Sequence, residues 1–235
     1  MQKPKAVFCW SGGKDSALAL YRIIREDRFQ VVALLTTFTH TGRISMHQVR
    51  EELMDAQAAS AGIPLEKAWP RDGSNRAYEQ AMEEKLMQLK AAGASHVVFG
   101  DIFLQDLRAY REQMLRKLGL QGVFPLWQQD TAALIREFFH TGFGAITCCV
   151  SSLFFREGDV GRELDAGFIR QLPPEVDPCG ERGEFHTFCH QGPLFSNPVL
   201  FEKGGKHFEL FQHGSGQDGF WFIDLFITQT TSKRK

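Results

Sequence analysis

The sequence predicts an α/β fold: a doubly wound parallel five-stranded sheet, followed by a smaller C-terminal α+β lobe. From residue 5 to about 150, continuous apolar runs alternate with helix-like segments and short links. Such alternation is typical of a parallel sheet that helices cover on both faces. After about residue 150 the chain becomes rich in Gly and Pro. We therefore expect one domain over 1–150 and a lobe over 151–235.

Apolar runs and helix-ending residues place the elements of the first part. The second helix should end at Ala61, because Gly62 suits the position after a helix end and Pro64 prevents extension. Ser74 or Asn75 can cap the third helix. The predicted strands are 6–10, 30–38, 65–69, 96–102, 123–127 and 144–150, and the predicted helices are 15–26, 46–61, 75–92, 107–118 and 131–140.

The C-terminal part shows less regular structure. Residues 151–173 hold one short helical pattern, 173–198 form a long stretch rich in Gly and Pro, and 206–228 read as two strands around a Gly-rich turn. Long loops without secondary structure are usually functional or disordered. Aromatic and charged residues within 177–195 argue against disorder, so this loop is a candidate site.

The composition excludes some classes of protein. The chain has 235 residues, and its net charge of -1 gives no reason to expect a nucleic acid as the main partner. No apolar run has membrane-spanning length, so we expect a cytoplasmic protein. The basic tail 232–235 reads as a solvated end. Five cysteines, with Cys148 and Cys149 adjacent, do not resemble a disulfide framework and indicate reduced thiols.

The first strand is followed by the string S-G-G-K-D-S, residues 11–16. Ligands of open parallel sheets bind at the carboxyl ends of the strands. Gly12 and Gly13 let the backbone turn sharply and approach a ligand closely. The helix that follows directs unpaired N–H groups at the same point, so the string predicts an anion site.

The side chains of the string suit a phosphate. Ser11 and Ser16 add hydroxyl donors, and Lys14 adds a positive charge. Asp15 would repel a phosphate unless a cation lies between them, and Mg²⁺ held by Asp15 and phosphate oxygens would resolve that conflict. In the alternative interpretation, Asp15 or Ser16 merely caps the helix. The full string favours the anion site.

The string resembles the PP-loop of the ATP pyrophosphatases, which bind ATP and cleave it between the α- and β-phosphates. Other segments resemble the diphthine–ammonia ligase branch of that superfamily, although Arg182 stands where that branch has Asn. The resemblance implies a sheet of the HUP (adenine nucleotide alpha hydrolase) type. The matching segments are 11–20, 46–65, 96–102, 108–120, 124–127 and 177–188.

The resemblance implies an ATP-dependent amide synthesis with ATP and Mg²⁺ as cofactors. A substrate carboxylate attacks the α-phosphate, and ammonia then displaces AMP. The carboxylate would belong to a modified histidine on a translation elongation factor, or else to a small molecule. Arg182 bears on which substrate is used rather than on the class of reaction.

The loop after Asp177 supplies candidate catalytic groups. Ammonia is ammonium at pH 7, so its binding and deprotonation call for carboxylates and a histidine. Glu181, Glu184 and His186 provide that set, and with Lys14 they are the predicted catalytic residues. In the alternative interpretation, Asp177 and Glu181 only accept hydrogen bonds from backbone N–H groups of a Pro/Gly turn.

The ends of two other strands are expected at the nucleotide. Gly100 permits close approach of adenosine or AMP, and Asp101 either accepts from a substrate amine or caps the next turn. Thr36 and Phe38 end the second strand and are placed to meet the adenine or ribose. With residues 11–16, these are the predicted nucleotide-binding residues.

The resemblance assigns Arg108 and Glu112 to the substrate pocket. Their i,i+4 spacing equally suits an ordinary surface pair on a helix. His47 is expected at a helix start beside the cleft, where a histidine near a helix cap is the simpler interpretation.

Other functions are less well supported. Cys179, His186, Cys189 and His190 lack the paired spacing of zinc ligands. The chain has no C-x-x-C pair of the kind that sulfur transfer to tRNA would require. A simple nucleotide hydrolase or a non-catalytic ATP or AMP sensor stays open, although a sensor has no need of the acidic loop. The Phe-rich C-terminal strands could form a homodimer interface.

Overall fold

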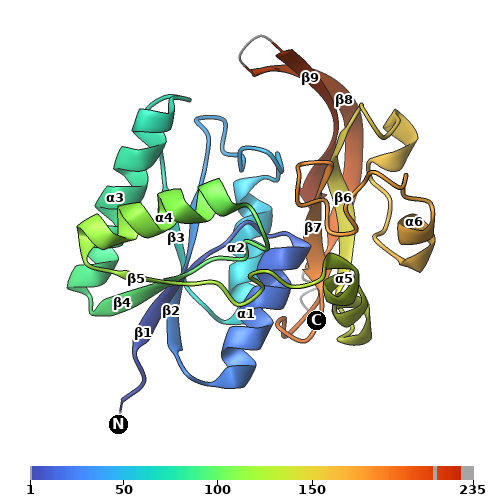
Figure 1. The fold of residues 1–235 in the computed structure, drawn as a ribbon. Coiled ribbons are helices and arrows are strands. Elements are labelled where there is room, and N and C mark those ends of the chain that lie inside the picture. The colour runs from blue at the N-terminus through green and yellow to red at the C-terminus, as the bar shows by residue number, and fades with distance from the viewer. Residues whose placement is uncertain (1, 214–215, 229–235) are drawn as a thin grey trace, which may run out of the picture.

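A computed structural model describes residues 2–213 and 216–228, which form two sheets (Figure 1). The first sheet is entirely parallel, in the order β3-β2-β1-β4-β5. Its strands are β1 (Lys5–Cys9), β2 (Gln30–Thr37), β3 (Leu65–Ala68), β4 (Ala94–Val98) and β5 (Gln121–Val123). The predicted five-stranded parallel sheet is therefore confirmed.

Helices cover both faces of this sheet, as a doubly wound fold requires. Val7 and Phe8 are adjacent on β1, and their side chains point to opposite faces. Phe8 lies in the same buried cluster as Leu20 and Leu53, whereas Val7 lies in the cluster that holds Leu86. The helices are α1 (Lys14–Glu26) and α2 (Glu51–Ala61) on the first face, and α3 (Asn75–Ala91) and α4 (Gln105–Leu118) on the second.

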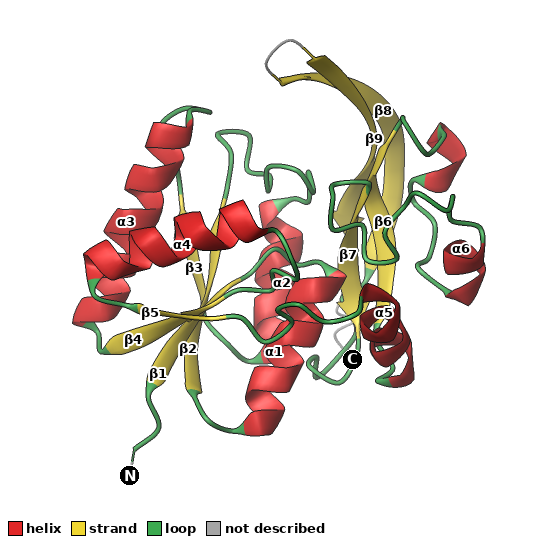
Figure 2. Ribbon diagram, viewed as in Figure 1, coloured by secondary structure: helices red, strands yellow, loops and turns green. Residues whose placement is uncertain are grey.

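The second sheet is antiparallel, in the order β7-β6-β9-β8, and forms the predicted C-terminal α+β lobe. Figure 2 shows α6 on the side of this sheet that faces away from the first sheet. The elements are α5 (Thr131–His140), β6 (Gly144–Ser151), the short 3-10 helix η1 (Glu157–Asp159), α6 (Ala166–Arg170), β7 (Phe185–Gln191), β8 (Phe201–His213) and β9 (Gly216–Ile227).

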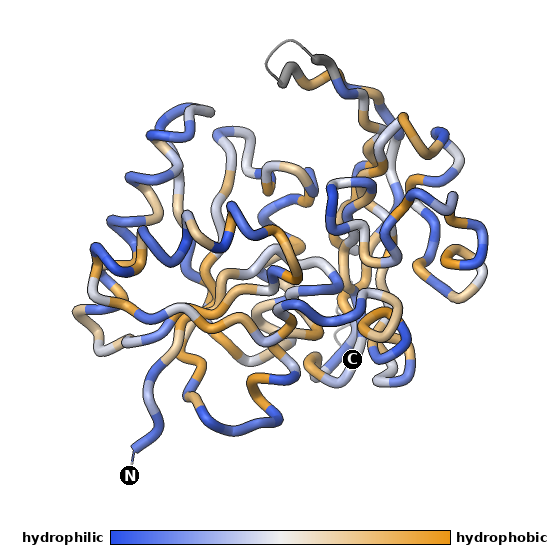
Figure 3. The backbone as a smooth tube through the Cα atoms, in the orientation of Figure 1, coloured by the Kyte–Doolittle hydropathy of each residue, from blue (hydrophilic) through white to orange (hydrophobic). Residues whose placement is uncertain are grey.

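The two sheets pack together through α1 and α2, which lie between them (Figure 1). Helix α1 contacts β7, and α2 contacts β9. One buried apolar cluster runs through both parts of the chain, and Figure 3 shows hydrophobic residues concentrated along the strands. A backbone hydrogen bond of 2.8 Å from Cys189 N–H to Gly12 C=O ties β7 directly to the glycine-rich loop.

The prediction that residues 144–150 belong to the parallel sheet is wrong. They form β6, which pairs antiparallel with β7 and β9. β6 is a central strand whose residues are almost all buried, so its sequence is as continuously apolar as that of a parallel strand. The separate roles assigned to 1–150 and 151–235 stay a prediction.

Four other predicted elements differ from the structure. The strand over 96–102 is observed as β4, which ends at Val98, so 99–102 is not a strand. The helix over 46–61 begins at Glu51, because Gln48 has a φ of 52°, which is incompatible with a helix; its end at Gly62 is confirmed. Strand β5 ends at Val123, so 124–127 is not a strand. β7 lies inside the stretch predicted as a loop. The two C-terminal strands are confirmed, while their Gly-rich turn and the basic tail 232–235 lie outside the described residues.

Candidate functional site

The glycine-rich loop depends on its two glycines. Gly12 has a φ of 75°, and an added Cβ there would lie 2.7 Å from Oε1 of Gln57. Gly13 is the N-cap of α1 and has no side chain to cap the helix, whereas Thr187 Oγ1 on β7 accepts from the Lys14 N–H over 3.1 Å. The interpretation of Asp15 or Ser16 as the cap is therefore wrong, because both lie inside the first turn of α1. The first turn of α1 directs its N–H groups at the place where an anion would bind.

The two serines of the loop bind each other. Ser11 Oγ and Ser16 Oγ lie 2.7 Å apart, and the backbone N–H of Gly13 donates to Ser11 Oγ over 3.3 Å. This pair closes the loop onto the first turn of α1. Both hydroxyls are thereby held at the place where an anion would contact the helix N-terminus.

Lys14 is 3% exposed and lies beneath the acidic loop, residues 177–184. Its ammonium donates to the Cys179 carbonyl and, over 2.8 Å, to the Asp15 carboxylate, and it lies 5.1 Å from the Phe185 ring centre. Burial lowers the pKa of Lys14. Asp15 and other neighbours raise that pKa by more than burial lowers it, so the pKa lies above its ordinary value. Lys14 is thus a buried positive charge shared by the two parts of the chain.

Glu184 holds the backbone of the acidic loop together. It is 3% exposed, and its two oxygens accept from Asp177 N–H and Arg182 N–H, each over 2.9 Å. Asp177 in turn accepts from Cys179 N–H over 2.8 Å. The interpretation in which loop carboxylates satisfy backbone donors therefore describes Asp177 and Glu184. A catalytic role for Glu184 stays a prediction.

Glu181 reaches across to the end of β4. Its Oε1 accepts from Ile102 N–H over 2.9 Å and from Phe103 N–H over 3.3 Å. Burial raises the pKa of Glu181 to about 7; the two backbone donors and Lys14 lower it, and Asp15 raises it. A carboxyl group that titrates near neutral pH is suited to accept and return a proton.

The end of β4 packs against the start of α1. A Cβ at Gly100 would lie 3.2 Å from Ser16 N, so glycine permits this close approach. Asp101 forms an ion pair of 2.8 Å with Arg111, whose guanidinium lies 4.3 Å from the Phe99 ring centre. Burial raises the pKa of Asp101, while Arg111 lowers it. Asp101 is thus paired within the protein, and its role at a nucleotide stays a prediction.

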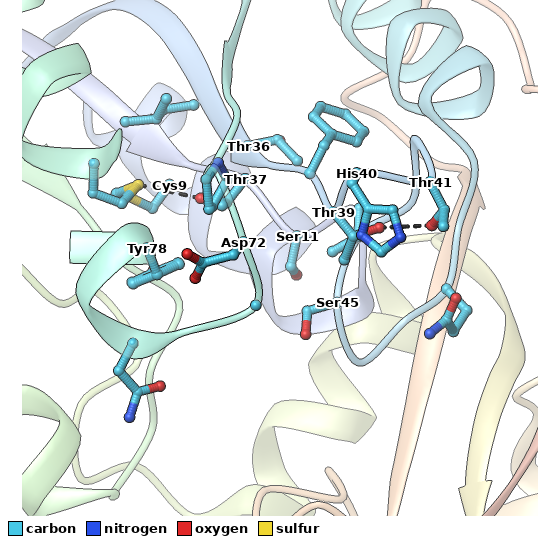
Figure 4. A pocket seen from close by; sticks show the side chains of 18 of the residues that line it. Cys9, Ser11, Thr36, Thr37, Thr39, His40, Thr41, Ser45, Asp72 and Tyr78 are labelled. Atoms are coloured by element: carbon cyan, nitrogen blue, oxygen red, sulfur yellow. Dashed lines mark hydrogen bonds between the residues drawn. The ribbon is translucent and has the colours of Figure 1, made fainter. Parts of the chain in front are cut away.

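A cavity of about 660 Å³ opens at the carboxyl ends of β1 and β2. Its size falls within the usual range of small-molecule sites. Ser11, Thr36 and Phe38 line it, as the prediction for an adenine or ribose pocket requires. Figure 4 shows Asp72 and Tyr78 on one side of Ser11, facing the segment Thr39, His40 and Thr41 on the other side.

Two of the predicted nucleotide residues also have structural contacts. The Thr36 hydroxyl donates to the Trp10 carbonyl over 2.6 Å, which holds the exit of β1 against β2. Phe38 is buried, and its ring stacks on that of Trp69 with centres 5.1 Å apart. Contact of either residue with a nucleotide stays a prediction.

Arg108 and Glu112 form the i,i+4 pair on α4, 2.7 Å apart. The Arg108 guanidinium also lies 4.6 Å from the ring centre of Phe124 and 4.5 Å from that of Trp127. Neither Arg108 nor Glu112 is among the residues that line the 660 Å³ cavity. Their assignment to a substrate pocket stays a prediction.

Two residues that the sequence did not mark, Gln57 and Thr187, hold the glycine-rich loop, and His47 contacts one of them. Gln57 donates to the carbonyls of Gly12, over 3.0 Å, and Cys189, over 2.6 Å. Thr187 Oγ1 accepts from Lys14 N–H over 3.1 Å. His47 lies in the loop before α2 rather than at a helix start, and its Nδ1 is 3.1 Å from the Thr187 carbonyl. Only the resemblance of segment 46–65 could have marked Gln57.

The donor set at the loop suits Mg²⁺ only together with phosphates. Among residues 2–213 and 216–228 no group of three or more His, Cys, Asp or Glu could hold a metal ion. The Asp15 side chain is 30% exposed, so its carboxylate is accessible at the loop. Mg²⁺ is commonly bound by one or two carboxylates with substrate phosphates and waters supplying the other ligands. Asp15 fits that role.

Comparison with known families decides the relationship. The sequence model of the diphthamide synthase N-terminal domain matches residues 4–122, and that of the diphthamide synthase C-terminal domain matches residues 130–215. The chain belongs to the diphthamide synthase family. The resemblance to the diphthine–ammonia ligase branch of the PP-loop superfamily is thereby confirmed.

Curated members of this family that resemble the chain are named diphthine–ammonia ligase. The protein of Schizosaccharomyces pombe is 27% identical over 228 residues, which cover 88% of this chain but 37% of that protein. Those of Rattus norvegicus and Homo sapiens are 27% and 26% identical over 216 residues, covering 82% of this chain and 80% of each relative. This member of the diphthamide synthase family thus spans little more than a third of the fission-yeast relative.

The sequence predicts no membrane-spanning segment, and the helices of the structure can be compared with that prediction. Within the described part of the chain, no helix combines the length and the hydrophobicity needed to cross a bilayer.

Proposed function

We propose that the protein is an ATP-dependent ligase that adenylates a substrate carboxylate, releases pyrophosphate, and amidates the carboxylate with ammonia. One observation carries the proposal: the glycine-led start of α1 lies directly against the acidic loop through Lys14. The names of the related diphthine–ammonia ligases support the same chemistry.

The loop and the cavity would divide the nucleotide between them. The triphosphate would lie at residues 11–16, where backbone donors, two hydroxyls and the Lys14 ammonium converge. The adenosine would enter the neighbouring 660 Å³ cavity past Ser11, which belongs to the loop and also lines the cavity. Gly100 leaves room for this arrangement, because its missing side chain lets α1 start against β4. Asp15 would hold Mg²⁺, which when bound neutralises phosphate charge.

Adenylation needs charge screening more than covalent chemistry from the protein. A carboxylate that approaches the α-phosphate is repelled by the triphosphate, and a preorganised positive charge lowers that barrier. Lys14 supplies such a charge in a buried position, where electrostatic interactions are stronger than in water. Pyrophosphate then leaves with the electron pair of the broken α–β bond.

Glu181 is suited to the second step. Ammonium must lose a proton before nitrogen can attack the adenylated carboxyl carbon, and AMP leaves when the amide bond forms. The pKa of Glu181, raised to about 7 by burial, lets its carboxylate accept that proton at neutral pH. His186, on β7, is a further member of the predicted catalytic set.

The acceptor and the assembly are further parts of the proposal. The names of the relatives point to diphthine, a modified histidine carried by a translation elongation factor, as the carboxylate; a small molecule is the alternative. Arg108 and Glu112 would contact the acceptor. A homodimer through the Phe-rich C-terminal strands and a cytoplasmic location complete the proposal.

Product analysis tests the reaction class. Purified protein with ATP, Mg²⁺, ¹⁵N-ammonium and diphthine-bearing elongation factor should yield AMP, pyrophosphate and one ¹⁵N atom per acceptor, as read by mass spectrometry. AMP and pyrophosphate without incorporated nitrogen would indicate a hydrolase. ADP and phosphate would contradict α–β cleavage, and nucleotide binding without turnover of any acceptor would favour a sensor.

A further inference from the structure

Two imidazole rings meet on the β7 side of the glycine-rich loop. His47 comes from the loop before α2, and His186 comes from β7, yet their ring centres lie 4.8 Å apart. A Cβ on Gly13 would lie 2.9 Å from Cε1 of His47, so the ring borders the space that glycine leaves open. The next residue along β7, Thr187, binds the Lys14 backbone N–H. The pair therefore lies at the anion loop itself.

Both rings are neutral in the protein without nucleotide. The hydrogen bond of His47 Nδ1 to the Thr187 carbonyl fixes a donor at Nδ1 and leaves Nε2 as an acceptor. Burial lowers the pKa of His47 to about 4, and the charge of Lys14 contributes. Burial, then His47, then Lys14 lower the pKa of His186 well below its ordinary value.

Among the described residues, few charged or titratable groups lie close enough to change the pKa of the two rings. Lys14 on α1 is the charged one, and it opposes protonation of both rings. Cys149 is the register partner of His186 on β6, and burial raises the pKa of its thiol, so it stays neutral. Burial is the main cause of the low pKa of both rings, and Lys14 adds to it; a polyanion at the loop would offset Lys14 and also serve as the counter-charge of a buried proton on the pair.

We propose that the His47–His186 pair belongs to the polyphosphate site, takes up one proton when a triphosphate binds, and presents an imidazolium to the departing pyrophosphate. This inference rests on the proposed binding of ATP at residues 11–16. One proton is expected rather than two, because two adjacent imidazolium rings would repel each other.

The proton has a defined use in adenylation. An oxygen of the substrate carboxylate bonds to the α-phosphorus, the bond from the α-phosphorus to the bridging oxygen breaks, and its electron pair goes to pyrophosphate. The imidazolium N–H then faces the oxygen on which charge develops, as Lys14 does. It either stays as a hydrogen-bond donor or leaves with pyrophosphate as one proton, and the pair returns to its neutral state.

Titration calorimetry tests this inference without an acceptor. α,β-Methylene-ATP with Mg²⁺ is bound to the full chain at pH 7.5 in buffers of different ionisation enthalpy, and the slope gives the protons taken up. The wild type should take up about one proton more than the double variant His47→Asn/His186→Asn. The double variant should also bind the analogue about tenfold more weakly, since it loses a charge-assisted contact.

Four further variants sharpen the result. Glu181→Gln removes a carboxyl group whose pKa of about 7 could also change proton uptake, and it should keep the uptake that depends on the histidines. His140→Asn, at the exposed end of α5, should behave as wild type. The single variants His47→Asn and His186→Asn report separately if the double variant fails to fold. Equal proton uptake by wild type and folded histidine variants would overturn the inference, whereas a wild type that does not bind the analogue would overturn the proposed ATP site.

Discussion

Exchange of Lys14 for alanine should lower the rate of AMP and pyrophosphate formation by about a hundredfold to a thousandfold. The reason is that Lys14 is a buried ammonium at the start of α1, and removal of one preorganised donor to developing negative charge costs about that factor. The measurement is the initial rate of AMP release at saturating ATP and acceptor.

The Lys14 variant needs two controls, because the same ammonium donates to Asp15 and Cys179. Lys85→Ala removes a surface ion pair of 3.0 Å with Glu66 and should leave the rate unchanged. Thermal melting shows how much of the Lys14 effect comes from loss of folded protein. A folded Lys14→Ala protein with a rate within threefold of wild type would remove Lys14 from the mechanism.

Exchange of Glu181 for glutamine should lower amidation by about a hundredfold to ten-thousandfold, the usual contribution of general acid–base catalysis. Formation of AMP in a single turnover should fall much less, because adenylation requires no proton from ammonium. The amidation rate of the wild type should rise with pH through an ionisation near 7, since Glu181 must be ionised to accept a proton and its pKa is about 7. The variant should lack that ionisation.

Glu184→Gln is the matched control, because it makes the same change three residues away. Glu184 accepts from two backbone N–H groups of its own loop, so its exchange should lower the melting temperature without removing the ionisation near pH 7. If Glu181→Gln kept the ionisation and Glu184→Gln lost it, the two carboxylates would have to exchange roles.

The glycine-rich loop could be predicted because its signals are local. A buried strand, two glycines and the start of a helix all lie within ten residues. Each can be recognised from its neighbours in sequence alone. The same local reasoning failed for 144–150, because a central antiparallel strand buried on both faces is as apolar as a parallel one. It also missed β7, whose seven residues are surrounded by turns rich in Gly and Pro.

The contacts that distinguish the polar residues of the site from one another could not be predicted. Glu181 and Glu184 are the same residue type in one loop, and only the partners show that Glu181 reaches the segment after β4 while Glu184 holds its own loop. His47 and His186 are far apart in sequence, and they meet because the loop before α2 lies against β7. Pairing at this separation leaves no periodic signal in one sequence.

The central claim, that a carboxylate rather than water attacks the α-phosphate, is tested most directly by running the reaction in ¹⁸O-water. Mass spectrometry of the AMP then reports which oxygen reached the phosphorus. The account predicts AMP without ¹⁸O in the presence of the acceptor, because the new oxygen comes from the unlabelled carboxylate. AMP that carries ¹⁸O on its phosphate, released at the same rate with or without the acceptor, would show hydrolysis and contradict the ligase.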